Sequence, residues 1–310
     1  MALRMALAPI SPERLKRPSR RSSLLRKCLS SSIARGLIIS GKSAWVHRAF
    51  YRLLANRFGP ETPWHFMNYG FDSEAFRKHP LNLAPEDEID RLFIQLYDYL
   101  LSSLPIAGTT VLEVGCGRGG GAAYVARYLR ARRMVGIDLC HRSVRTCMTN
   151  HHAQNVAFLT GDAQRLPFRD SSFDVVINVE SSHGYASMAA FLEEVHRVLR
   201  PGGCFVFADL RWDMSDRQST PSRGVTVLQQ QLVNCGLVVI HEADLSSGVL
   251  QSRTADNERQ RESIRQLVRP SLRAAFAELA GLPGTTMYQH LEARNLVYWS
   301  SVLRKPLGVT

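Results

Sequence analysis

The sequence predicts a doubly wound α/β fold built on a seven-stranded, Rossmann-like sheet, and two observations support this prediction. Beyond residue 105, short apolar runs rich in β-branched residues alternate with helical stretches, as parallel strands with crossover helices require. A glycine-rich turn stands where the first strand gives way to a helix, in VLEVGCGRGGG. The expected strands are Thr110–Val114, Met134–Asp138, Val156–Thr160, Phe173–Val179, Cys204–Leu210, Leu237–Ala243 and Asn295–Val302.

Helices are expected between these strands and ahead of them. A mostly helical insertion from Asp256 to Ala280 precedes the last strand. Before the sheet, apolar residues at helical spacing predict an amphipathic helix over 43–57, and three acids open a second helix over 85–102. The crossover helices begin near Gly119, Arg142, Met188 and Val225, and Pro201, Gly202 and Gly203 end the third of them.

The charge is unevenly distributed and divides the chain into three parts. Residues 1–60 hold thirteen Lys and Arg against the single acid Glu13, which accounts for the whole formal net charge of +12. We therefore expect a basic, disordered arm over 1–42, helices and a lid over 43–105, and the main domain over 106–306. Docking to a membrane surface or a partner, and organelle targeting, remain alternatives for the arm. Because the body is neutral, a nucleic-acid partner is not expected.

Composition narrows the class further. The six cysteines form no Cys-x-x-Cys pair, which favours a reducing compartment without structural zinc. No apolar run approaches the roughly 20 residues needed to span a bilayer. The sequence thus predicts a cytoplasmic protein that touches membranes at most peripherally. A homo-oligomer remains an alternative, because subunits could exchange the arm and the helix near Trp45.

The glycine-rich turn predicts a cofactor site. Alternate glycines let a ligand lie against the backbone, and a helix N-terminus offers free N–H groups. The run also satisfies Gly-x-Gly-x-x-Gly, so a dinucleotide has to be weighed. Three further features favour S-adenosylmethionine (SAM) instead. They are Glu113 before the turn, Asp138 at the end of the second strand, and Asp162 with Ala163 after the third. Asp138 can hold both ribose hydroxyls, Asp162 and Ala163 can meet the adenine edge, and no phosphate is required.

These motifs resemble, in order, those of class I SAM-dependent methyltransferases: VLEVGCGRGGG, VGIDL, GDAQRLPF, FDVVINVESSH and VLRPGG. The similarity is greatest to the phthiotriol and phenolphthiotriol dimycocerosate O-methyltransferases, through NYGF, NVESSHGY, ADLR and GTTMYQHLEARNLVYW. It spans roughly Trp64 to Leu303. The cofactor-binding residues that it implies are Tyr69, Glu113, Gly115, Cys116, Gly117, Gly119, Asp138, Leu139, Gly161, Asp162, Ala163, Asn178 and Glu180.

The resemblance also implies two catalytic residues. His183, just past the fourth strand, stands where related sugar and lipid O-methyltransferases carry a catalytic base, and histidine suits proton transfer near neutral pH. Asp209, at the end of the fifth strand, would orient His183 or hold the acceptor hydroxyl, with an ion pair to Arg211 as the alternative. The candidates for an apolar acceptor pocket are Trp64, Phe66, Phe71, Tyr185, Tyr288 and Trp299.

Several functions remain to be compared. The first is methyl transfer to a hydroxyl of a hydrophobic secondary metabolite or lipid. The second is C-methylation of a prenyl, terpenoid or sterol-like acceptor, with or without cyclisation. An NAD(P)-dependent oxidoreductase and a SAM-binding protein that does not consume SAM are the alternatives from other classes. No metal-ligand cluster is expected, and no Asn-Pro-Pro-Tyr-like motif supports methylation of amino groups.

Overall fold

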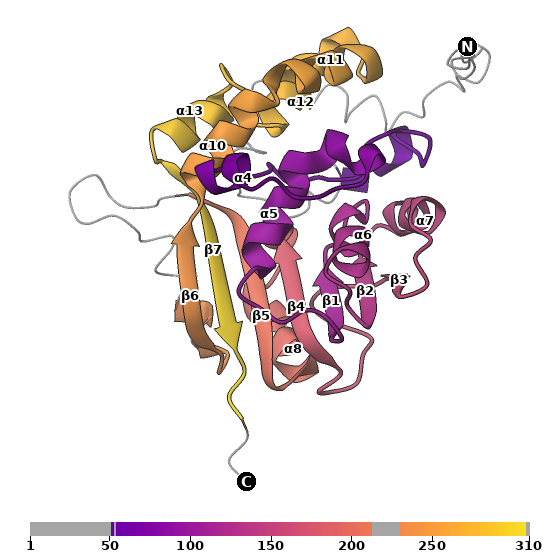
Figure 1. The fold of residues 1–310 in the computed structure, drawn as a ribbon, viewed down its shortest axis with the longest axis vertical. Helices are drawn as coiled ribbons and strands as arrows, with labels where there is room; N and C mark the ends of the chain where they lie inside the picture. The colour runs from indigo at the N-terminus through magenta and orange to yellow at the C-terminus, as the bar shows by residue number, and fades with distance from the viewer. Residues whose placement is uncertain (1–50, 53, 213–229, 233, 308–310) are drawn as a thin grey trace.

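The computed structural model describes residues 51–52, 54–212, 230–232 and 234–307, and these contain one seven-stranded sheet (Figure 1). The strand order is β3-β2-β1-β4-β5-β7-β6. The first five strands are parallel, and β7 runs antiparallel to both of its neighbours. The predicted fold class is therefore confirmed. The strands are β1 Thr110–Val114, β2 Arg133–Asp138, β3 Val156–Thr160, β4 Phe173–Val179, β5 Leu199–Trp212, β6 Val238–Asp244 and β7 Leu296–Arg304.

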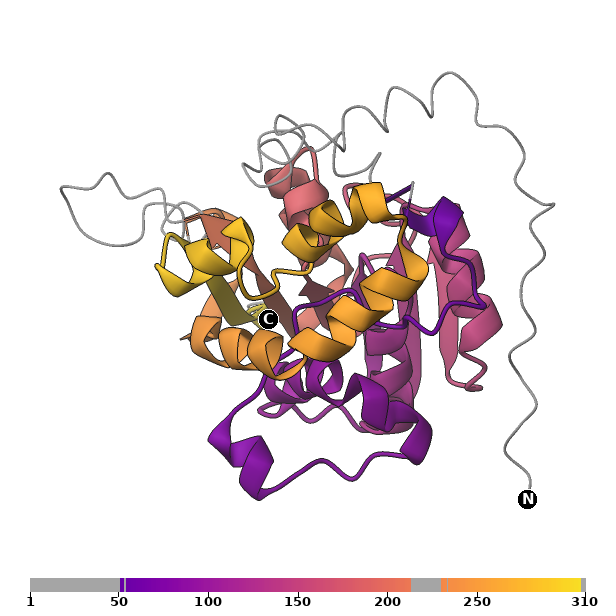
Figure 2. The same cartoon turned by 90° about the horizontal axis from the view of Figure 1, so that it is seen from above.

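Helices cover both faces of the sheet and its upper edge. One hydrophobic cluster joins the sheet to α5 (Arg91–Leu101) and α6 (Gly120–Arg127), and a second joins the opposite face to α8 (Met188–Val198). Figures 1 and 2 show a further helical layer across the edge where the parallel strands end. That layer contains α10 (Ser246–Ala255), α11 (Asn257–Leu267), η4 (Pro270–Leu272), α12 (Arg273–Leu279) and α13 (Thr286–Glu292).

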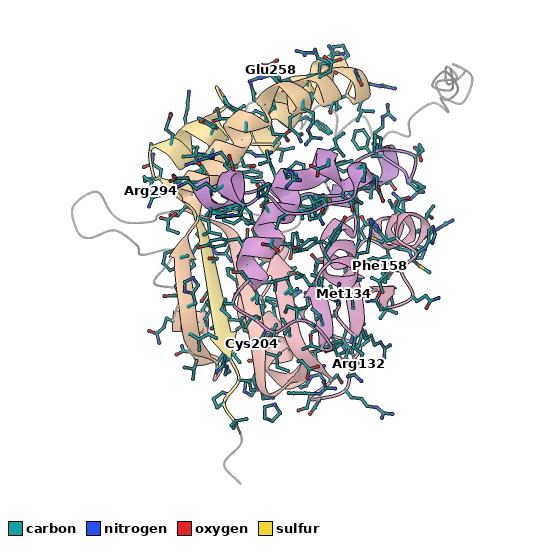
Figure 3. The ribbon with its side chains drawn as sticks, viewed as in Figure 1. Arg132, Met134, Phe158, Cys204, Glu258 and Arg294 are labelled. Carbon is teal, nitrogen blue, oxygen red and sulfur yellow. The ribbon has the colours of Figure 1, made fainter. Side chains whose placement is uncertain are left out.

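The crossover helix α7 (His141–Asn150) packs against β2 and β3. The remaining elements are α4 (Glu74–Lys78), η2 (Pro85–Asp90) and η3 (Ser182–Gly184). In Figure 3, Glu258 and Arg294 lie in the helical layer, whereas Met134 and Cys204 lie on strands of the sheet. Among the described helices, none combines the length and the apolar character that crossing a membrane requires.

The structure differs from the sequence-based expectations in several bounds. The helical insertion extends beyond Asp256–Ala280, since its helices run from Ser246 to Glu292. The helix expected over 85–102 begins as the 3-10 helix η2 and becomes α-helical at Arg91. Strand β5 begins at Leu199, because Gly202 and Gly203 pair with Lys305 just after β7. Of the helix expected over 43–57, residues 51–52 and 54–57 are helical; 43–50 and Val225 lie outside the described residues.

The topology indicates at which edge of the sheet a ligand would bind. The strand order reverses between β1 and β4, and open α/β sheets bind ligands at the carboxyl ends of strands beside such a switch point. Gly119, in the left-handed conformation with φ 84°, precedes α6. The first residues of α6 are small, and Gly121 lies directly against the ring of Tyr97 on α5. The glycines thus let β1 turn sharply into a helix that packs tightly on α5.

Replacement of Gly121 by valine should destabilise the protein by about 3 kcal/mol, at the upper end of the usual cost of overpacking. An added Cβ would lie 2.2 Å from Cζ of Tyr97, whose hydroxyl is held by Glu113 at 2.5 Å and therefore cannot easily yield. Urea denaturation followed by circular dichroism measures the change. Gly184→Val is the matched control, because among the described residues no atom other than those of its chain neighbours lies within 4 Å of the added Cβ. Equal midpoints for the two variants would contradict the prediction.

Candidate functional site

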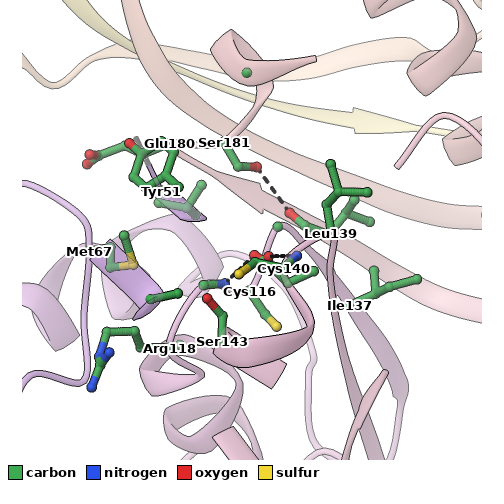
Figure 4. Close-up of a pocket in the computed structure, with 18 of the residues that line it drawn as sticks. Tyr51, Met67, Cys116, Arg118, Ile137, Leu139, Cys140, Ser143, Glu180 and Ser181 are labelled. Carbon is green, nitrogen blue, oxygen red and sulfur yellow. Dashed lines mark hydrogen bonds between the residues drawn. The ribbon is translucent and has the colours of Figure 1, made fainter. Parts of the chain in front are cut away.

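An open cavity of about 1250 Å³, a volume that includes the solvent at its mouth, lies between the carboxyl ends of β1, β2 and β4 and the chain segments above them (Figure 4). The glycine loop after β1 forms its floor, with Gly115 at φ 77° and Gly117 at φ 54°. Tyr51 and Glu180 lie on one side of the cavity in Figure 4, and Ile137 and Leu139 on the other. Nine of the predicted cofactor residues line it: Gly115, Cys116, Gly117, Asp138, Leu139, Gly161, Asp162, Ala163 and Glu180.

The other four predicted cofactor residues lie behind this lining. Glu113 is buried beneath the loop, where its Oε1 accepts a 2.5 Å hydrogen bond from the hydroxyl of Tyr97. Burial raises the pKa of Glu113 to about 7, although that hydrogen bond opposes the rise. Gly119 shapes the loop through its backbone conformation. Asn178 donates through Nδ2 to the carbonyl of Val114 at 2.9 Å and so ties β4 to β1.

Tyr69, the fourth of these residues, connects the lid to the site. Its backbone N–H donates to Oε1 of Glu180 at 2.7 Å, and its hydroxyl donates to the carbonyl of Leu279 at 2.8 Å. Oε1 of Glu180 also accepts a hydrogen bond of 2.8 Å from the hydroxyl of Tyr298. Despite these two donors, burial raises the pKa of Glu180 to about 7. Glu180 is thus a titratable group near neutral pH at the wall of the cavity.

Asp138 lies at the end of β2 beside the glycine loop. Its Oδ2 accepts from the backbone N–H of Gly117 at 2.9 Å, and its Oδ1 accepts from that of Cys140 at 2.7 Å. Burial raises the pKa of Asp138 to about 6, against the effect of the two backbone donors. Asp138 lines the cavity together with its neighbour Leu139, an apolar residue left 38% exposed.

His183 and Asp209 form a hydrogen-bonded pair. Nδ1 of His183 lies 3.0 Å from Oδ1 of Asp209, which is fully buried. Nε2 of His183 lies 3.5 Å from the hydroxyl of Tyr51, a residue that lines the cavity. Asp209 also contacts Arg211 at 3.7 Å, so the two interpretations offered for it from the sequence are not exclusive. His183 therefore presents Nε2 to a hydroxyl group at the cavity wall.

The charges of this pair depend on each other. Burial alone would lower the pKa of His183, but the Asp209 carboxylate beside it raises that pKa above its ordinary value. Burial alone would raise the pKa of Asp209, and the His183 and Arg211 charges instead hold it well below its usual range. Asp209 is thus ionised throughout the physiological pH range.

Arg118 was not predicted as a functional residue, yet it connects the glycine loop to the lid. Its guanidinium group is buried and donates to the backbone carbonyls of Phe58, Gly59 and Thr62 at 3.0, 3.0 and 3.5 Å, and to that of Trp64. These carbonyls belong to the segment that follows the N-terminal helical turns. No local sequence pattern reveals such contacts, because they depend on how a distant segment folds back.

Tyr51 and Tyr298 were also missed by sequence reasoning, and the aromatic candidates divide into two groups. Trp64, Phe66 and Tyr185 line the cavity, as expected. Phe71, Tyr288 and Trp299 are not among its lining residues. Phe71 packs against Tyr99 with ring centroids 4.6 Å apart, Tyr288 is hydrogen-bonded to Thr254, and Trp299 packs on the α8 face of the sheet. Three of the six aromatic candidates thus lie outside the lining of the cavity.

Comparison with known proteins agrees with this geometry. A family model described as "Methyltransferase domain" matches residues 112–207. The chain is 34% identical over 280 residues to the phthiotriol/phenolphthiotriol dimycocerosates methyltransferase of Mycobacterium tuberculosis, covering 90% of this chain and 96% of that protein. It is 35% identical to the fatty-acid O-methyltransferase of Mycolicibacterium smegmatis, covering 78% of this chain and 83% of that protein.

A solved structure shares the fold. The geranyl diphosphate C-methyltransferase from Streptomyces coelicolor A3(2), in complex with Mg2+, geranyl diphosphate and S-adenosyl-L-homocysteine, superposes with a TM-score of 0.55 and 18% identity, covering 82% of this chain and 98% of that one. The match of the family model and the long, 34% identical alignment show the family. The chain belongs to the class I SAM-dependent methyltransferases, in the branch of the phthiotriol and phenolphthiotriol dimycocerosate methyltransferases.

Proposed function

We propose that this SAM-dependent methyltransferase methylates a hydroxyl group of a hydrophobic small molecule, with His183 as the general base. The observation that supports this most is the orientation of His183. Its Nδ1 is held by Asp209 at 3.0 Å, while its Nε2 lies 3.5 Å from the hydroxyl of Tyr51. His183 lies just behind the lining of the cavity, next to Gly184 and in contact with Tyr51, which both line it. A histidine held in this way could receive a proton from an acceptor hydroxyl that reaches it.

The residues at the cavity fit SAM. In the proposed binding mode, Asp138 accepts hydrogen bonds from the ribose hydroxyls, and the carboxylate already accepts two backbone N–H groups there. Asp162 and Ala163 meet the adenine edge, and the exposed side chain of Leu139 covers its face. Gly115 and Gly117 allow the cofactor to approach the backbone, because their left-handed conformation leaves no Cβ in the way. When bound, SAM supplies an electrophilic methyl group on a sulfonium.

His183 and Asp209 divide the proton chemistry between them. Asp209, ionised and buried, accepts the hydrogen of Nδ1 and leaves the lone pair of Nε2 directed away from it. During transfer of the methyl group that bound SAM would supply, Nε2 of His183 would accept the proton that the acceptor hydroxyl loses. Asp209 then stabilises the imidazolium. Holding the acceptor in line with the methyl group is the larger contribution, worth up to about 7–11 kcal/mol in favourable cases.

The lining of the cavity favours a hydrophobic acceptor. Beneath the lid it is rich in apolar and aromatic side chains, including Leu54, Trp64, Phe66 and Met67. The M. tuberculosis and M. smegmatis relatives are named for lipid and fatty-acid acceptors, which supports the hydrophobic class.

C-methylation of a prenyl, terpenoid or sterol-like acceptor is the second candidate. The observation that favours it is the position of Glu180 at the cavity wall together with Tyr51 and Tyr185. A carboxylate and aromatic faces would stabilise a carbocation, and such a reaction would not need His183 as a base. Methylation of a hydroxyl would therefore require His183, whereas C-methylation would require Glu180.

Replacement of Asp138 by alanine should weaken SAM binding by about 10- to 100-fold, the cost of losing hydrogen bonds to a charged group. Isothermal titration calorimetry with SAM measures the change. The affinity of the unaltered protein should also fall as the pH drops through about 6, because protonated Asp138 can no longer accept both hydroxyls. Asp170→Ala is the control, since its side chain is 77% exposed in a surface ion pair. Unchanged affinity in Asp138→Ala would contradict the assigned role.

Replacement of His183 by glutamine should lower kcat for a hydroxyl acceptor by about 10²- to 10⁴-fold, the usual contribution of a general base, while SAM affinity stays unchanged. In the unaltered enzyme the rate should rise with pH through the elevated pKa of His183, because only the neutral imidazole accepts a proton. His79→Gln, on the exposed end of α4, is the control. An active His183→Gln together with an inactive Glu180→Gln would support C-methylation instead.

The product distinguishes the two candidates directly. Incubation with methyl-labelled SAM and fractionated extracts should place the label in an apolar fraction, and NMR of the product should identify a methyl ether. A label on carbon would support the second candidate. A label in protein or nucleic acid would contradict the proposal of a small hydrophobic acceptor.

A further inference from the structure

The carboxylate of Asp209 is shared between His183 and a second cation, Arg211. While Oδ1 faces His183, the other oxygen, Oδ2, accepts a 2.6 Å hydrogen bond from the hydroxyl of Ser182 and lies 3.7 Å from Nη1 of Arg211. Nη2 of Arg211 in turn donates to the hydroxyl oxygen of Ser182 at 2.6 Å. Two hydrogen bonds through the hydroxyl of Ser182 therefore link the guanidinium group of Arg211 to the carboxylate of Asp209.

Arg211 is itself held in place. Its guanidinium carbon lies 5.1 Å from the centre of the Phe207 ring, and Nη1 donates to the carbonyl of Leu210 at 3.4 Å. Its side chain is 17% exposed, and Asp209 is fully buried, so water screens their interaction little. Arg211 is thus a fixed charge beside the carboxylate that supports the base.

A fixed cation changes what Asp209 does to His183. A buried carboxylate with a histidine as its sole cationic partner would draw a proton onto that histidine, which could then no longer act as a base. An arginine stays charged at every relevant pH, so it can balance Asp209 while the imidazole is neutral. The Asp209 charge is compensated in this way whether or not His183 carries its second proton.

We propose that Arg211, acting through Ser182 and Asp209, is a positioning residue that limits the protonation of His183 by Asp209 and so makes its imidazole more available as a proton acceptor. This inference rests on the proposed function, in which His183 is the base. Among the residues that the structure describes, the charged and titratable groups facing His183 include Asp209 and Arg211 from β5, Glu180 from the end of β4 and Tyr51 from the N-terminal helical turns. Asp209 and Glu180 raise the pKa of His183, and Arg211 lowers it, against a background of burial that also lowers it.

The experiment that tests this proposal needs no acceptor. Two-dimensional ¹H–¹³C NMR of the full chain with S-adenosylhomocysteine follows the imidazole signal of His183, assigned by its loss in His183→Gln. In Arg211→Gln, the titration midpoint of His183 should rise by about one pH unit, since one unit corresponds to a modest change of 1.36 kcal/mol in charge interaction. In Arg211→Lys, the titration midpoint of His183 should lie close to that of the unaltered protein, because lysine keeps the positive charge.

A matched control lies on the same strand. Arg200, at the opposite end of β5, pairs with Asp174 at 2.5 Å, and Arg200→Gln should leave the His183 midpoint unchanged. If Arg211→Gln does not fold, Ser182→Ala takes its place and should shift the midpoint upward by removing the link through the Ser182 hydroxyl. An unchanged or lowered midpoint in a folded Arg211→Gln, or in Ser182→Ala when it is used, overturns the proposal.

The outcome is separable from that of the proposed function. When an accepted substrate is in hand, the acidic limb of the pH–rate profile should move upward in Arg211→Gln by the same amount as the NMR midpoint. A shifted midpoint with an unmoved pH–rate profile would support the tuning of His183 by Arg211. That same result would show that His183 is not the base in methyl transfer.

Discussion

The site depends on one constraint, which is that the parallel strands β1, β2 and β4 end at the same edge of the sheet. Their last residues and the turns that follow bring together groups far apart in the chain, including the glycine loop, Asp138 and Glu180. Backbone N–H groups at these ends are unpaired by the sheet and can bind ligands or side chains. Asp138 uses two of them in the structure, from Gly117 and Cys140.

The same edge gathers buried charge, and the surroundings of each acid determine its protonation. Glu113 and Glu180 have mainly neutral donors around them, so burial raises the pKa of each to about 7. Asp209 has two cationic partners and remains ionised. Asp209 thus differs in protonation from the two glutamates, because of its cationic partners.

Much of this arrangement could be predicted from local sequence. The seven strands lay close to their expected bounds, because β-branched runs flanked by glycine and proline mark strands reliably. The start of β5 was not predicted, because Pro201 and Gly202 look like a break unless the pairing with Lys305 is known. The loop glycines and Asp138 were expected from local sequence motifs. The roles of His183 and Asp209 were expected from the resemblance to the family.

The residues that sequence reasoning missed share a physical property. Arg118, Tyr51 and Tyr298 act through contacts with segments that are distant in the chain, and periodicity contains no information on such contacts. Trp299 shows the converse, since an aromatic residue in a family-like motif faces the core instead of the cavity. The bounds of the helical layer were likewise set by its packing over the edge of the sheet.

Arg118 has a consequence for how the two substrates bind. It belongs to the glycine loop, and its guanidinium group holds the carbonyls of the segment that covers the cavity. A ligand that displaces the loop therefore also displaces the cover, and a molecule that lifts the cover acts on the loop. Thermodynamic reciprocity requires any such coupling to be equal in both directions. Any coupling between ligands bound at the loop and at the covering segment would therefore pass through the hydrogen bonds of Arg118.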